Sequence, residues 1–173
     1  MTTATKSNAA PAQKSPAKSA TTAAAPDAVT LLMDDHKKVK KLFKDYEKLA
    51  KKDDIEGKVE IAMKICEDLT VHAQVEEEIF YPAARDAIKD DELLNEAEVE
   101  HATAKDLIAQ IEHMSGDEPM YDAKVKVLSE YIDHHVEEEE TEMFPKARKA
   151  KMDLEGLAVE MMERKEELMA AMV

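Results

Sequence analysis

Apolar residues recur at spacings of three and four along the chain from Asp27 onward. This spacing is typical of amphipathic helices, because it places the apolar side chains on one face. The pattern predicts helices over residues 27–52, about 56–88, about 92–114 and about 120–149, followed by a Met-rich helix within residues 151–173. Pro82 lies inside the second helix and should kink it or end its regular part, because proline lacks a backbone N–H.

Residues 1–26 show no such period and contain Ala, Thr, Ser, Pro and Lys without an aromatic or acidic residue. Such a segment buries too little apolar surface to offset the entropy of ordering it, so we expect a flexible tail. The predicted organisation is therefore a tail over 1–26, a helical bundle over 27–150 and a C-terminal helix over 151–173.

Composition supports an all-α fold in one domain. The chain has 173 residues, of which 44% are hydrophobic and only 3 are glycine. The formal net charge of −15 disfavours binding to nucleic acid, whose backbone is also negative. No apolar run approaches the roughly 20 residues that span a bilayer, so we expect no membrane partner. The single cysteine, Cys66, fits a reducing compartment, and a cytoplasmic location is expected.

An internal repeat organises the bundle. Residues 67–85 align without a gap on residues 130–148, so that His72 matches His135 and Glu76 matches Glu139. The first and third helices align at a slightly larger offset, and the pairs that match there include His36 with His101. Two such helical hairpins can bury their apolar faces only against each other. The repeat thus predicts an antiparallel up-down four-helix bundle with approximate two-fold symmetry.

The repeated polar residues lie on the predicted inner faces of the helices. A His and a Glu four residues apart on a helix can reach one point, and their burial is costly unless they satisfy each other or a cation. The acids beside Glu76 and Glu139 are expected to point to solvent. Imidazole with carboxylate suits iron, manganese or zinc, and two central carboxylates can bridge a metal pair. The predicted metal ligands are His36, His72, Glu76, His101, His135 and Glu139.

The segments "HAQVEEEIFYP" and "HVEEEETEMFP", with one histidine in each preceding helix, resemble the hemerythrin-like family, the HHE cation-binding domain. The resemblance covers about residues 28–149. It implies that the six residues ligate a non-haem di-iron centre, with Glu76 and Glu139 as bridging carboxylates and an oxo or hydroxo group completing the bridge. It also implies an open position that binds oxygen, peroxide or nitric oxide.

One position departs from the pattern of the oxygen-carrying members of that family, which have a second histidine one turn after the first in the third helix. Here that position is Lys105, and a protonated lysine does not coordinate metal. One iron should therefore lack a nitrogen ligand and take water or another side chain. His113 lies too far along the helix to substitute, and His134 is expected at the surface or just outside the ligands.

Three functions fit these features. The first is a di-iron protein that binds or senses oxygen, peroxide or nitric oxide, with a protein partner contacting the tail or the fifth helix. The second is a di-iron redox enzyme that decomposes peroxide or handles nitric oxide or iron. The third is a metal-free helical adaptor whose histidines are incidental.

Overall fold

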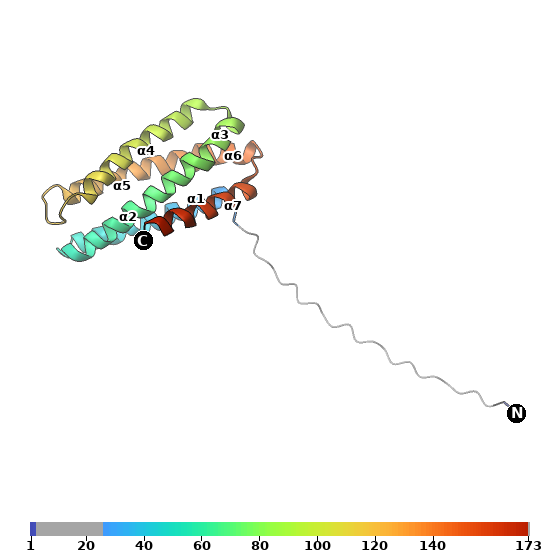
Figure 1. Ribbon diagram of the computed structural model, residues 1–173, viewed down its shortest axis with the longest axis horizontal. Coiled ribbons are helices and arrows are strands. Elements are labelled where there is room, and N and C mark those ends of the chain that lie inside the picture. The colour runs from blue at the N-terminus through green and yellow to red at the C-terminus, as the bar shows by residue number, and fades with distance from the viewer. Residues whose placement is uncertain (3–25, 173) are drawn as a thin grey trace.

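The structure is a computed structural model that describes residues 1–2 and 26–172, and it is entirely helical over the ordered elements of that range (Figure 1). Residues 3–25, which make up most of the predicted tail, lie outside the described residues. The elements in chain order are α1 (Ala28–Ala50), α2 (Ile55–Val75), η1 (Glu76–Phe80), α3 (Tyr81–Ile88), α4 (Asp91–Glu112), α5 (Tyr121–Glu138), η2 (Glu139–Met143), α6 (Phe144–Lys149) and α7 (Leu154–Ala171).

Aspartates start four of these helices. Each accepts a hydrogen bond from a backbone N–H in the first turn, which would otherwise have no partner. The distances are 2.8 Å from Asp27 to Thr30 N, 3.0 Å from Asp54 to Gly57 N, 3.3 Å from Asp90 to Leu93 N and 3.0 Å from Asp153 to Gly156 N. These caps fix where α1, α2, α4 and α7 begin.

The helices form an antiparallel bundle of two hairpins, as the repeat predicts. The first hairpin pairs α1 with the long rod made by α2, η1 and α3, and the second pairs α4 with the rod made by α5, η2 and α6 (Figure 1). The fifth helix, α7, runs along α1 and α2. It therefore covers the outside of the first hairpin and leaves the second hairpin without an equivalent cover among the described helices.

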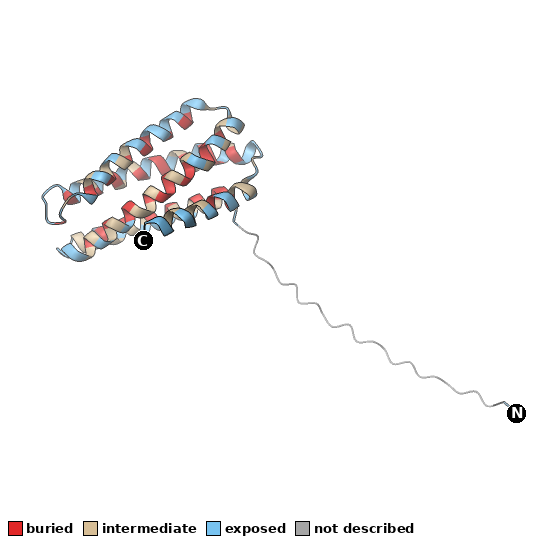
Figure 2. Cartoon of the chain, in the orientation of Figure 1, coloured by how far each residue is buried: buried red, intermediate tan, exposed pale blue. Residues whose placement is uncertain are grey.

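The buried residues lie on the faces that the helices turn toward one another (Figure 2). They form two apolar clusters, one at each end of the bundle. One cluster contains Leu32, Phe80 and Phe144, and the other contains Phe43, Ile65 and Leu128. Buried histidines and glutamates belong to neither cluster, so polar groups interrupt the core between its two apolar ends.

A π-helical turn interrupts each long rod just before its proline. The N–H of Tyr81 bonds to the carbonyl of Glu76, and the N–H of Phe144 bonds to that of Glu139. Five residues span about 140° in a regular α-helix, whereas a π turn brings the fifth residue back near the starting face. Tyr81 and Phe144 consequently share the inner face with the two glutamates.

The regular part of the second helix ends close to Pro82, as predicted. Proline geometry points to the carbonyl of Glu78, four residues before Pro82, whereas the irregular turn begins two residues earlier, at Glu76. Ile79, which the regular period places on the inner face, is only partly buried, because the π turn shifts that face toward Phe80 and Tyr81.

Within the described part of the chain, none of the helices combines the length and the apolar character that crossing a membrane requires.

The packing of α7 can be tested with two adjacent methionines. Met161 is 2% exposed within the apolar core, and Met162 is 45% exposed. We predict that Met161→Ala lowers the free energy of unfolding by roughly 2–5 kcal/mol, because it leaves a cavity. Met162→Ala should change it by less than about 0.5 kcal/mol, as expected for a surface substitution. Urea unfolding monitored by circular dichroism measures both, and equal effects would contradict this position of α7.

Candidate metal centre

The structure brings all six predicted metal ligands together in the middle of the bundle. Each long rod and each of the helices α1 and α4 contributes, and all six side chains are buried. They form two groups that share a glutamate, and the possible ligand atoms within each group lie within 4.8 Å of one another. The groups are His36, His72, Glu76 and Glu139, and Glu76, His101 and His135.

The ligand atoms face one another without the bonds that such buried atoms require. His72 Nε2 lies 3.2 Å from Glu76 Oε2, and His36 Nε2 lies 3.3 Å from Glu139 Oε2. Yet neither nitrogen nor either glutamate oxygen has a hydrogen-bond partner among the described residues. A buried polar atom without a partner is costly, and a cation between these atoms would satisfy all of them at once. The residues therefore fit a metal ion.

Each of the four histidines is held by a carboxylate on its other ring nitrogen, Nδ1. The pairs are His36 with Glu140 at 2.9 Å, His72 with Asp35 at 3.5 Å, His101 with Glu77 at 3.0 Å and His135 with Glu100 at 2.7 Å. When Nδ1–H donates to a carboxylate, a neutral imidazole turns the lone pair of Nε2 toward the centre of the bundle. Such carboxylate–histidine pairs orient metal-binding imidazoles and raise their basicity.

The two imidazoles of the second group also face each other. His101 Nε2 lies 3.0 Å from His135 Nε2, and each ring donates its Nδ1–H to its own glutamate. Two Nε2 lone pairs at this distance repel each other unless a proton or a metal ion lies between them. The second group thus needs either a shared proton or a metal ion between its two rings.

Negative charge at the centre changes the protonation of the histidines. Burial alone would lower the pKa of His72, but the carboxylates of Glu76 and Asp35 raise it to about 10. Burial likewise opposes protonation of His135, whereas Glu139 and Glu100 raise its pKa to about 9. These imidazoles therefore hold protons at neutral pH when no metal is bound, and a metal ion must displace them.

Comparison with known proteins places this geometry in a family. The model of the hemerythrin HHE cation-binding domain matches residues 27–147. The chain belongs to this family. The fold is also similar to the crystal structure of a hemerythrin HHE cation-binding domain-containing protein from Mycobacterium kansasii, with a TM-score of 0.69 and 23% identity over 85% of this chain and 90% of that one.

A curated relative shares part of the sequence. A DNA nickase from Nostoc sp. is 32% identical over 114 residues, which are 66% of this chain and 31% of that protein. The chain thus spans about a third of the length of that relative.

The carboxylates behind the histidines correct one sequence prediction for this HHE domain. Glu77 and Glu140, which directly follow Glu76 and Glu139, were expected to point to solvent. They are instead partly buried and accept hydrogen bonds from His101 and His36. The internal repeat contains all four carboxylates. Glu77 matches Glu140 in the rods, and Asp35 matches Glu100, each directly before a histidine of α1 or α4.

One pair of residues breaks the symmetry of the HHE centre. Phe144 stacks on His36 with ring centroids 5.8 Å apart, and Tyr81 stacks on His101 in the same way at 5.3 Å. The Tyr81 hydroxyl donates to Glu139 at 2.8 Å and lies 3.2 Å from His101 Nε2. Burial and the nearby carboxylates keep the pKa of Tyr81 well above its usual value, so the phenol retains its proton.

The structure shows where the side chain of Lys105 lies. Its ammonium does not point toward the ligands but forms an ion pair with Glu77, 2.6 Å away. His113 is exposed, bonds to a backbone carbonyl and does not join the ligands, and His134 is 61% exposed beside Glu100, as expected for a residue at the surface. The two halves of the centre consequently have two histidines each.

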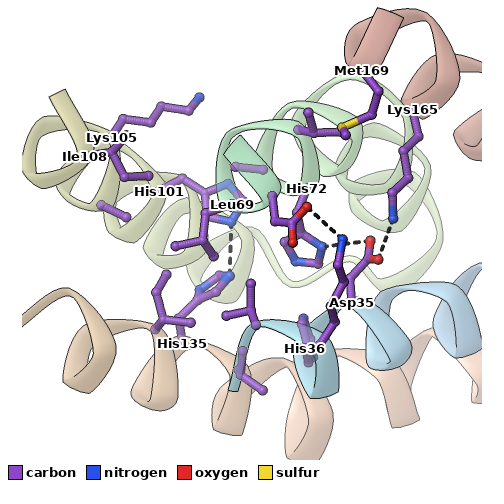
Figure 3. A pocket seen from close by; sticks show the side chains of 18 residues that line it. Asp35, His36, Leu69, His72, His101, Lys105, Ile108, His135, Lys165 and Met169 are labelled. Atoms are coloured by element: carbon purple, nitrogen blue, oxygen red, sulfur yellow. Dashed lines mark hydrogen bonds and ion pairs between the residues drawn. The ribbon is translucent and has the colours of Figure 1, made fainter. Parts of the chain in front are cut away.

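A small cavity adjoins the histidines. It has a volume of about 30 Å³, and its walls include Leu69, Ala104, Ile108, Ile132 and Val136. Figure 3 shows His101 and His135 facing each other on one side of it, with Lys165 of α7 reaching Asp35 behind His72 on the other. One water molecule needs about 10–15 Å³ of such a volume, so the cavity can take a molecule of two or three atoms.

The carboxylates behind the histidines can be tested directly. We predict that Glu140→Gln weakens metal affinity by roughly 10–100-fold, because it replaces the charged carboxylate that orients His36 and raises its basicity with a neutral amide. Glu137→Gln is the control, since Glu137 is exposed on the same rod. Competition with a chromophoric chelator measures the affinity of both variants. Equal affinities would show that Glu140 does not support the centre.

Proposed function

We propose that this chain is a non-haem di-iron protein of hemerythrin type that binds or senses a small ligand, namely oxygen, peroxide or nitric oxide. The observation that carries the proposal is the set of buried ligand atoms that face one another without hydrogen bonds. The unpartnered atoms belong to the first group of ligands, and one iron ion would satisfy them. The second group shares Glu76 with the first and adds the facing Nε2 atoms of His101 and His135, which would hold a second ion.

The arrangement of the donors supports a specific assignment. Glu76 and Glu139 would bridge the two ions, because each lies within reach of histidines from both hairpins. His36 and His72 would hold one ion and His101 and His135 the other. When bound, the iron pair with its oxo or hydroxo bridge supplies an open coordination position and redox electrons.

The cavity supports the choice of ligand. Apolar side chains line the wall beside the histidines, and the volume of about 30 Å³ favours a ligand of a few atoms over a larger organic molecule. A diatomic molecule or peroxide fits this size. Sensing would also require a protein partner, and we propose the N-terminal tail or the exposed face of α7 as its contact.

Turnover of peroxide is the second candidate, and Tyr81 is the observation that favours it. Its hydroxyl retains its proton, which it donates to Glu139, and lies 3.2 Å from His101 Nε2, so rotation of the O–H would let it donate instead to a ligand held on that side. Phe144 offers no such group on the opposite side. We do not extend the DNA nicking of the Nostoc relative to this chain, because the net charge of −15 repels a DNA backbone.

The ligand proposal predicts a spectroscopic response. Iron-loaded protein should contain two iron ions per chain, and its near-ultraviolet charge-transfer bands should shift reversibly with oxygen, azide or nitric oxide. His72→Ala should lose iron and the response, whereas His113→Ala, at an exposed histidine outside the centre, should keep both. Unchanged iron content and melting temperature in His72→Ala would instead support the metal-free adaptor.

The turnover proposal predicts a separate effect of Tyr81→Phe. This variant removes only the hydroxyl, so the iron content should stay the same while the rate of peroxide decomposition falls at least several-fold. Iron content by metal analysis and oxygen release from peroxide measure the two quantities. A wild-type protein that decomposes peroxide no faster than free iron would rule out this second candidate and leave ligand binding intact.

A further inference from the structure

The two-fold repeat places a different surface outside each half of the centre. In the first hairpin, Asp35 holds His72, and Val71 and Val75 are buried beside it. At the matching positions of the second hairpin, Glu100 holds His135, and His134 and Glu138 replace the two valines. Two buried apolar residues of one half thus correspond to two polar, metal-binding types of residue in the other.

The fifth helix accounts for the first of these surfaces. It packs over α1 and α2, and Lys165 forms an ion pair with Asp35. The carboxylate behind His72 therefore has a cation on its outer side (Figure 3). The lysine ammonium offsets the charge that Asp35 brings close to the buried centre.

No described helix supplies such a cation to the second half. Glu100 is only 8% exposed, and its Oε2 accepts the hydrogen bond from His135. Its other oxygen, Oε1, accepts no hydrogen bond from a described residue and lies 3.6 Å from His134 Nε2. Neither Glu100 nor Glu138 forms an ion pair with a described lysine or arginine.

The three side chains have the spacing of a metal site. His134 Nε2 lies 3.4 Å from Glu138 Oε1, and one atom of each residue lies within 4.8 Å of the others. Ligand atoms about 3.4 Å apart are what a tetrahedral ion with bonds of about 2.1 Å requires. The carboxylates of Glu96 and Glu142 add negative charge near Glu138.

We propose that Glu100, His134 and Glu138 form an outer site for a first-row divalent cation, which takes the place that Lys165 occupies in the first hairpin. One histidine with two carboxylates suits zinc, manganese or iron. Because Glu100 would bind the outer cation with one oxygen and His135 with the other, the cation reduces the charge that Glu100 offers to this imidazole. The outer site thereby tunes one half of the centre, a role that rests on the proposed di-iron function.

Zinc added to the iron-loaded full chain tests the site. Equilibrium dialysis against zinc chloride, with zinc and iron both measured, should show one more zinc per chain in the wild type than in His134→Ala. The iron content should be equal in the two proteins. His134 is exposed, so its substitution should leave the helical circular dichroism unchanged, and His113→Ala is the matched control that should bind zinc like the wild type.

The absorption of the iron centre tests the coupling. Zinc should shift the charge-transfer bands of the wild type and of His113→Ala but not those of His134→Ala. Equal zinc binding in all three proteins would overturn the outer site, and so would zinc uptake that is matched by an equal loss of iron. If zinc binds to the wild type but its charge-transfer bands do not shift, the coupling is overturned. If the chain holds no iron, the proposed di-iron function is wrong. The outer site is still tested in that case by the difference of one zinc between the wild type and His134→Ala.

Discussion

The burial of two carboxylates in the middle of an apolar bundle is the constraint on which the rest of this structure depends. Glu76 and Glu139 are fully buried, and a charge removed from water is very costly unless an opposite charge compensates it. Four imidazoles surround these carboxylates. His72 and His135 can compensate the charge by holding protons, and all four imidazoles face the glutamates so that they could hold metal together with them. The same donors thus stabilise the fold without metal and are ready to exchange their protons for cations.

The arrangement around the carboxylates follows from this constraint. Every histidine of the centre has an acidic partner on its outer nitrogen, which fixes the ring and keeps Nε2 directed inward. The π-helical turns add a further layer, because they bring the aromatic rings of Tyr81 and Phe144 onto the faces of His101 and His36. The ligands therefore have little freedom, as expected for a preorganised metal centre.

Helical periodicity and the internal repeat were enough to predict the bundle and to select the six inner residues. The repeat mattered because a single His and Glu at this spacing is common in a chain with 39 acidic residues. The same abundance concealed Glu77 and Glu140, which look like part of an ordinary solvated acidic face. The π turns were also missed, because a regular period gives no sign of an i to i+5 hydrogen bond. The position of α7 over the first hairpin depends on tertiary packing, which no local sequence pattern reveals.

The main feature of the molecule is an approximate two-fold symmetry that a few pairs of residues break. Tyr81 opposite Phe144, and the outer partners of Asp35 and Glu100, make two similar half-sites chemically different.

The central claim is that Glu76 and Glu139 bridge two metal ions. Anomalous diffraction at the iron edge, from crystals of the iron-loaded chain, tests this most directly. The account predicts two peaks about 3.5–4 Å apart between the two carboxylates, each next to two histidines. A single peak, or none between them, would contradict it.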